Sequence, residues 1–181
     1  MTLQPPVSFP AEEAAHWVLL RPISQIDDDL FDLSDTDGDE DLGSHPWSIL
    51  IVDDDSEVHR AVELALMGVR VDGRPLDLAH CLSAADARKH LAEKSRAIDL
   101  VLLDVVMETA DAGLTLLDEM RTAPATQSLP VLLHTGQPGQ APEGLIRSRY
   151  DISGYLTKTT VTRQGLITAL ESILSEQRGA G

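Results

Sequence analysis

The sequence predicts an open α/β domain in which five strand–helix units, (βα)5, form a five-stranded parallel sheet with helices on both faces. Short apolar runs rich in Val, Ile and Leu predict strands at 47–52, 98–104 and 129–135. Weaker runs at 76–83 and 154–158 predict two more strands. Strands that are buried on both faces read as continuous apolar runs, because neither face meets water. This pattern is typical of a parallel sheet.

The segments between these strands have apolar residues at the spacing of an α-helix. Ser83 and Asp86 resemble a capping box that begins the helix after the second strand. Strands that alternate with helices run parallel, and the working site of such a sheet lies outside the carboxyl ends of its strands. The apolar faces are Val58, Ala61, Val62, Ala65 and Leu66 in the first helix, and Leu166, Ile167, Leu170, Ile173 and Leu174 in the last.

The chain is predicted to have three segments, the first of which is set apart by its charge. Residues 1–46 are predicted to form an acidic, largely disordered N-terminal extension, residues 47–176 the folded domain, and residues 177–181 a short tail. The first 47 residues hold eleven Asp and Glu against one base, Arg21. Such a composition is too charged to build a core of its own.

Composition also excludes several classes of partner. The net charge of -16 over 181 residues argues against nucleic acid and anionic membranes, because both carry phosphates that would repel the chain. No apolar run approaches the length of a membrane span, and no secretory signal begins the chain. The single cysteine, Cys81, cannot form an internal disulfide, as is usual in a reducing compartment. We therefore expect a cytoplasmic protein.

Polar residues stand at the ends of the predicted strands. Asp53 and Asp54 follow the first strand, Asp104 ends the third, Thr135 ends the fourth and Lys158 ends the fifth. Parallel strands bring these residues to one rim of the sheet. Two carboxylates ~4 Å apart repel by roughly 4 kcal/mol at an effective dielectric near 20. A hard divalent cation such as Mg²⁺, together with the Lys158 ammonium, would relieve that repulsion.

Four segments, "ILIVDDD", "DLVLLDVVM", "VLLHTG" and "SGYLTK", carry a resemblance to a known family. Over about residues 47–176 the chain resembles the receiver domain of two-component response regulators. The resemblance implies a flavodoxin-like, doubly wound fold. It also implies that Asp104 is the phosphoacceptor, and that Asp53, Asp54, Asp104 and the backbone carbonyl of Val106 hold Mg²⁺. Asp55 would be a variable neighbour.

The resemblance implies roles for three further residues and a class of partner. Lys158 would assist phosphoryl transfer together with the hydroxyl of Thr135, and Thr135 and Tyr155 would form the conformational switch. The donor would be a phosphohistidine of a histidine kinase or of a histidine phosphotransfer protein. The output would be a phosphorylation-dependent contact with a downstream protein that the residues do not specify. His134 is predicted to be a hydrogen-bonded neighbour of this site and not a relay histidine.

The sequence departs from the common receiver pattern at several points. Glu108 and Thr159 replace two usual prolines, and the interval from Asp104 to Gly113 is one residue longer than usual. The segment 67–78 also lengthens the link between the first helix and the second strand. These features look like those of receivers that often precede larger output modules, HD-type phosphodiesterases among them. Because the sequence stops just past the last helix, we expect a stand-alone receiver without an enzymatic domain.

Two other functions fit part of the pattern. A phosphatase of the haloacid-dehalogenase type would use a D-x-D pair in "ILIVDDDS" and Lys158. That family also needs an acidic pair after the lysine, whereas here Glu171 and Glu176 follow within the last amphipathic helix, and Asp104 would be left without a role. A receiver-like docking module that is never phosphorylated is the second alternative, and the intact acidic set argues against it.

The acidic extension supports two hypotheses of its own. In the first it is a solubilising disordered tail. In the second Trp17, Leu30 and Phe31 dock reversibly on the fourth and fifth helices of the receiver, aided by charge. A calcium loop is not supported, because counting from Asp35 puts Glu40 where the EF-hand pattern needs glycine.

Overall fold

The computed structural model describes residues 45–94, 97–136, 139 and 142–179. The predictions for residues 1–44, including the docking of Trp17, Leu30 and Phe31, therefore lie outside the described residues. Along the described part, strands and helices alternate as predicted. The elements are β1 (Trp47–Val52), α1 (Ser56–Leu66), β2 (Arg70–Val71), β3 (Arg74–Cys81), α2 (Ala84–Lys94), β4 (Leu100–Leu103), α3 (Ala112–Thr122), β5 (Val131–Thr135), α4 (Glu143–Arg149), β6 (Gly154–Thr157) and α5 (Arg163–Gly179).

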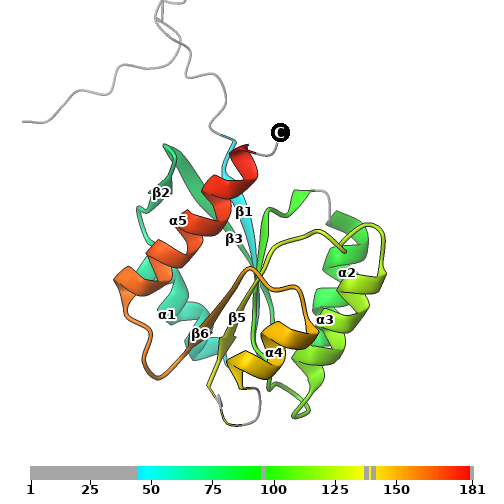
Figure 1. Cartoon of the computed structure of the whole chain (residues 1–181). Coiled ribbons are helices and arrows are strands. Elements are labelled where there is room, and N and C mark those ends of the chain that lie inside the picture. Colours follow the sequence, from blue (N-terminus) through cyan, green and yellow to red (C-terminus); the bar gives the residue numbers. More distant parts are fainter. Residues whose placement is uncertain (1–44, 95–96, 137–138, 140–141, 180–181) are drawn as a thin grey trace, which may run out of the picture. The chain divides into compact units, whose positions relative to one another are not determined.

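The strands form a single sheet in the order β2-β3-β1-β4-β5-β6 (Figure 1). The five predicted strands are β3, β1, β4, β5 and β6, and neighbours among them all pair parallel. The chain thus places its second strand beside the first and then continues outward on the other side. This is the doubly wound order of the flavodoxin-like fold, and the predicted fold class is confirmed.

The sheet has one strand more than predicted. Strand β2 pairs antiparallel with β3, with Val71 opposite Arg74. The two-residue turn between them is Asp72-Gly73, with φ of 50° and 80°. Positive φ at both central residues is the geometry that tight hairpins favour, and Asp-Gly is a common sequence for it. The lengthened segment 67–78 is therefore an added hairpin at the sheet edge and not a longer loop.

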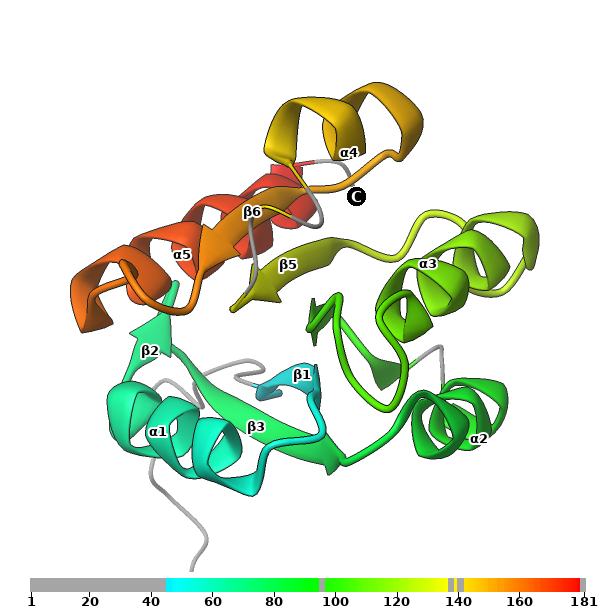
Figure 2. The same ribbon diagram turned by 90° about the horizontal axis from the view of Figure 1, so that it is seen from below.

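Helices cover both faces of the sheet, and the core is correspondingly divided into two layers. Figure 2 shows α1 and α5 against one face and α2, α3 and α4 against the other. The side chains of β1 point alternately into the two layers. Ile49 and Ile51 belong to the α1/α5 layer, while Leu50 and Val52 belong to the other. All four are fully buried, and each contributes roughly 1.5–3 kcal/mol of transfer free energy. A continuous apolar run in β1 is needed to supply both layers.

The added hairpin holds the start of β1. The indole N–H of Trp47 donates to the carbonyl of Val71 at 3.0 Å. The guanidinium of Arg74 lies 3.5 Å from the centre of the Trp47 ring, which is a cation–π contact. Its Nε also donates to the carbonyl of His45 at 2.6 Å.

Across the described residues, no helix combines the length and the apolar character that spanning a bilayer requires.

Gly113 brings the start of α3 directly against the loop that follows β4. Its N–H donates to the carbonyl of Val105 at 3.0 Å. A Cβ on Gly113 would collide with the backbone carbonyl oxygen of Asp104. The absence of a side chain at Gly113 therefore fixes how closely α3 approaches the end of β4.

Gly113→Ala should lower the free energy of unfolding by roughly 2–4 kcal/mol, because backbone atoms cannot yield to the new methyl group. Urea denaturation would measure the loss. Gly144→Ala is the matched control, since a Cβ there meets nothing within 4 Å and alanine is the better helix former. Equal stability of Gly113→Ala and Gly144→Ala would contradict this account of the loop.

Candidate functional site

Three aspartates gather at the carboxyl ends of β1 and β4, and we call Asp53, Asp54 and Asp104 the acidic rim. The two strands are neighbours, and their hydrogen bonding continues past the strand ends, from the Asp104 N–H to the Val52 carbonyl at 2.9 Å. One oxygen from each of the three carboxylates lies within 4.8 Å of the others. Asp53 and Asp104 are buried and Asp54 is exposed. The rim is therefore closed toward the core and open toward solvent.

Lys158 connects the two buried carboxylates of the rim. Its backbone N–H donates to the Thr135 carbonyl at 2.8 Å, which carries it one residue past β6. Its ammonium lies 2.6 Å from Oδ2 of Asp53 and 2.6 Å from Oδ2 of Asp104. Burial acts to lower the pKa of Lys158, but hydrogen bonds to Asp104 and Asp53 outweigh it and raise the pKa. The lysine is therefore charged at neutral pH.

The second oxygens of the buried carboxylates are held by backbone donors. The Asp55 N–H donates to Asp53 Oδ1 at 3.1 Å, and the Val106 N–H donates to Asp104 Oδ1 at 3.3 Å. Burial raises the pKa of Asp104, the nearby Asp53 adds to the rise, and Lys158 opposes it. Three carboxylates and one ammonium leave a formal charge of -2, which one divalent cation would neutralise. Carboxylate oxygens at this spacing suit a hard ion such as Mg²⁺.

Asp55, the last of the three consecutive aspartates at 53–55, has a structural role that the sequence analysis did not predict. Asp55 is the N-cap of α1, and its side chain accepts a hydrogen bond from the Glu57 N–H at 2.8 Å. An aspartate directly before a helical period is a known capping signal, so the pattern could have identified it. Asp55 thereby begins α1 immediately after the acidic rim.

Three other predicted site residues are Thr135 and Tyr155, on neighbouring strands, and Val106, in the loop after β4. Thr135 is fully buried at the end of β5, and Tyr155 is half-buried on the adjacent β6, opposite Leu133. Burial raises the pKa of the Tyr155 phenol, and Glu143 at the start of α4 adds to the rise. Val106 contributes its N–H to Asp104, whereas a role for its carbonyl as a metal ligand stays a prediction.

His134 corrects the prediction of a hydrogen-bonded neighbour. The ring is buried, and its Nε2 has no hydrogen-bond partner among the described residues. Burial first, and then the Lys158 charge, lower the pKa of His134 to about 4. The prediction failed because the partner of a strand side chain depends on which helices pack over that face. His134 is neutral at physiological pH.

His134 and Lys158 line a hollow of about 260 Å³ between α1 and the segment that leads into α5. Its walls are mostly apolar, and the lining side chains on the helix side are Val58, Ala61, Val62, Ala65 and Leu166. Because Lys158 also contacts Asp104, the hollow adjoins the acidic rim. A partner that fills it would stand beside the buried carboxylates.

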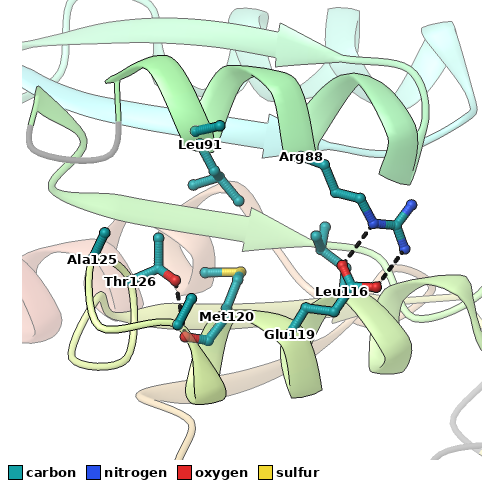
Figure 3. Close-up of a pocket in the computed structure, with 9 residues that line it drawn as sticks. Arg88, Leu91, Leu116, Glu119, Met120, Ala125 and Thr126 are labelled. Atoms are coloured by element: carbon teal, nitrogen blue, oxygen red, sulfur yellow. Dashed lines mark hydrogen bonds and ion pairs between the residues drawn. The ribbon is translucent and has the colours of Figure 1, made fainter.

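A second hollow, of about 190 Å³, lies between α2 and α3 (Figure 3). Arg88 reaches across it to Glu119 through two hydrogen bonds of 2.6 and 3.1 Å. Leu91, Leu116 and Met120 supply apolar walls. None of its lining residues belongs to the acidic rim, so this hollow adds nothing to the chemistry there.

The two departures from the usual prolines have local explanations. Glu108 accepts a hydrogen bond from the Ala84 N–H at 3.0 Å, which ties the loop after β4 to the start of α2. At the other position, Thr159, the chain turns after Lys158 through bonds from Thr160 and Val161 N–H groups to the Thr157 carbonyl, at 3.0 and 2.9 Å. Neither departure displaces a residue of the acidic rim.

Comparisons with known proteins agree with this geometry. Residues 49–171 match the sequence family described as the response regulator receiver domain. A curated relative from Vibrio cholerae, the 3'3'-cGAMP-specific phosphodiesterase 2, is 45% identical over 133 residues, which make up 74% of this chain and 25% of the relative. The chain thus spans about a quarter of the length of that relative.

Solved structures show the same fold. The signal receiver domain of an HD domain-containing protein from Pseudomonas fluorescens Pf-5 is 28% identical with a TM-score of 0.60, over 74% of this chain and 98% of that one. A response regulator receiver domain protein from Clostridium thermocellum is 23% identical with a TM-score of 0.62, over 75% and 99%. The N-terminal domain of a response regulator receiver protein from Methanoculleus marisnigri JR1 is 31% identical with a TM-score of 0.51, over 71% and 97%.

The burial of His134 predicts a pH dependence of stability. Its folded pKa of about 4 lies below the ordinary value of 6.5, so the unfolded chain takes up a proton first as the pH falls. The contribution to the free energy of unfolding is complete above about pH 6.5 and declines toward pH 4, by roughly 2–3 kcal/mol. Urea denaturation across this range should show a smaller decline in His134→Leu, while His90→Gln on α2 should decline like the wild type. Parallel curves for His134→Leu and wild type would exclude this origin.

Proposed function

Because the chain belongs to the response regulator receiver family of two-component signalling, we propose that it accepts a phosphoryl group on Asp104 from a histidine kinase or a histidine phosphotransfer protein. The observation that carries this proposal is the Lys158 ammonium, which lies 2.6 Å from the carboxylates of both Asp53 and Asp104. This contact supports the proposal because it holds a buried carboxylate next to a positive charge at the carboxyl ends of the strands.

Phosphoryl transfer depends mainly on positioning and on neutralising charge. Asp104 presents one carboxylate oxygen to Lys158 while the other accepts from the Val106 N–H. The carboxylate is thus fixed in rotation before a donor arrives, which favours in-line attack on a phosphohistidine. Lys158 would then stabilise the oxygens of the transferred group.

Magnesium is part of the proposal, with Asp53, Asp54, Asp104 and the carbonyl of Val106 as its ligands. When bound, the ion would neutralise the formal charge of the acidic rim and the oxygens of the phosphoryl group. The spacing of the three carboxylates supports this assignment. Asp54, which is exposed, would be the residue that meets an arriving ion first.

Thr135 and Tyr155 are proposed to report the phosphorylated state. The backbone carbonyl of Thr135 accepts a hydrogen bond from the Lys158 N–H, so a displacement of Lys158 would act directly on the end of β5. Tyr155 lies on the neighbouring strand and is half-buried. Aspartyl phosphate at Asp104 would draw the Thr135 hydroxyl inward and change the packing of Tyr155, which a downstream protein would detect.

The hollow beside Lys158 supports the choice of donor. A helix that carries a phosphohistidine needs an apolar seat close to the acceptor, and the apolar side of α1 adjoins Lys158 and His134 there. We also propose a cytoplasmic location, where thiols stay reduced, which is compatible with the single cysteine, Cys81, being free and buried. The activity named for the Vibrio cholerae relative is not carried over, because the match spans a quarter of that protein.

The alternatives receive less support. A haloacid-dehalogenase-type phosphatase would leave Asp104 idle, yet Asp104 is buried, bonded to Lys158 and part of the acidic rim. A docking module that is never phosphorylated would not need to bury two like charges 2.6 Å from one ammonium. Both buried charges are costly and are retained most readily where chemistry uses them.

Incubation with acetyl phosphate and Mg²⁺ should add one phosphoryl group, and Asp104→Asn should abolish the addition. Intact-mass spectrometry or a phosphate-affinity gel would measure it. Asp77→Asn, an exposed residue of β3, is the control and should be labelled like the wild type. Labelling that survives in Asp104→Asn, or that proceeds with a chelator present, would overturn the assignment of the acceptor.

Two of the three consecutive aspartates should have different roles, Asp54 as a metal ligand and Asp55 as a helix cap. Mg²⁺ should raise the melting temperature of the wild type and of Asp55→Ala, but hardly that of Asp54→Ala, because an ion stabilises a fold only through its site. Without metal, Asp55→Ala should lose about 1 kcal/mol through the lost cap, and Asp54→Ala should lose little. Differential scanning calorimetry with and without Mg²⁺ separates the two effects, and an equal response of the two variants to Mg²⁺ would contradict the assignment.

A further inference from the structure

Two histidine rings lie next to each other beside the acidic rim. His59 lies on α1 and His80 near the end of β3, and their Nδ1 atoms are 2.8 Å apart. The ring centres are 4.9 Å apart and the planes make an angle of 65°. Neither residue has a role in the proposed phosphoryl transfer.

The other nitrogen of each ring is already committed as a donor. His59 Nε2 lies 2.8 Å from the backbone carbonyl oxygen of Asp53, which can only accept. His80 Nε2 lies 3.0 Å from Oε1 of Glu63, a carboxylate that likewise accepts. Each Nε2 therefore carries its hydrogen, and in the neutral ring Nδ1 then bears a lone pair. Two Nδ1 lone pairs 2.8 Å apart repel each other, and a cation that both nitrogens can reach would relieve this repulsion.

We propose that His59 and His80 bind a divalent late transition metal, Cu²⁺ or Ni²⁺, through their two Nδ1 atoms, with water completing the coordination. With metal–nitrogen bonds of about 2.0 Å, nitrogens at this separation subtend about 90° at the metal. That is the angle between neighbouring ligands in the square or tetragonal coordination of Cu²⁺ and Ni²⁺, whereas tetrahedral Zn²⁺ needs a wider one. The metal class follows from this angle and from the nitrogen ligands.

The surroundings of the two rings have the form that metal-binding histidines require. A ligating histidine usually donates its other N–H to a carboxylate or a backbone carbonyl, which orients the ring and makes the ligand more basic. Glu63 serves His80 in this way and the Asp53 carbonyl serves His59. The His80 side chain is 28% exposed, so an ion can reach the pair from solvent.

This site is distinct from the acidic rim in chemistry but joined to it by one hydrogen bond. The rim offers carboxylate oxygens, which suit hard ions, and the histidine pair offers nitrogens, which suit softer ones. His59 holds the carbonyl of the same Asp53 whose side chain contacts Lys158. The late transition metal would thereby fix the backbone at the start of the loop after β1.

Titration calorimetry of the full chain with Ni²⁺, in excess Mg²⁺ to occupy the acidic rim, tests the proposal. One Ni²⁺ should bind, and His80→Gln should weaken it by about tenfold or more. Glu63→Gln should weaken it by about tenfold, as loss of an orienting partner does. His90→Gln on α2 is the matched control and should bind like the wild type. Electron paramagnetic resonance of the Cu²⁺ form should show two nitrogen ligands.

Circular dichroism would establish that His80→Gln is folded, which is expected for a side chain at the surface of β3. Ni²⁺ affinity that is unchanged in His80→Gln, or a Cu²⁺ spectrum without two coupled nitrogens, would overturn the proposal. Failure of Ni²⁺ to bind at all would likewise overturn the proposal. These readouts do not depend on phosphorylation, so they stand whether or not Asp104 is the acceptor.

Discussion

The Lys158 ammonium between Asp53 and Asp104 is the interaction on which the site depends. Two buried carboxylates repel at this spacing, and a single cation 2.6 Å from each makes their burial tolerable. The three residues directly follow β1, β4 and β6, so the contact exists only when the parallel register is correct. The same charge also adds to the effect of burial in lowering the pKa of the nearby His134.

The three consecutive aspartates, Asp53, Asp54 and Asp55, differ in burial and in what their side chains contact. Asp53 is buried and faces Lys158, Asp54 is exposed at the mouth of the rim, and Asp55 caps α1. Successive residues leaving a strand point in different directions, so one acidic triplet can serve the core, the solvent and a helix. Repulsion among them is limited because each carboxylate meets a different partner or water. The proposed phosphoacceptor, Asp104, lies apart from this triplet, directly after β4.

Sequence reasoning identified the five parallel strands and all four charged residues that meet at the rim, because burial on both faces produces apolar runs and strand ends are predictable from them. It missed β2, although Asp72-Gly73 is a hairpin signal, because a two-residue strand has no periodicity to detect. It also missed the contact of Glu108 with α2 and misjudged His134. Both depend on elements far apart in sequence, whose packing no local pattern encodes.

By itself, the sequence determined the alternation of strands and helices, the placement of carboxylates and lysine at strand ends, and the family to which they belong. Local periodicity and short-range propensity suffice for these properties, because each concerns a few neighbouring residues. Tertiary structure alone decided that Lys158 contacts two aspartates at once, that Gly113 abuts the carbonyl of Asp104, and that His59 faces His80 across α1 and β3. Those contacts join residues from different strands and helices, and their distances are set by how the helices pack on the sheet.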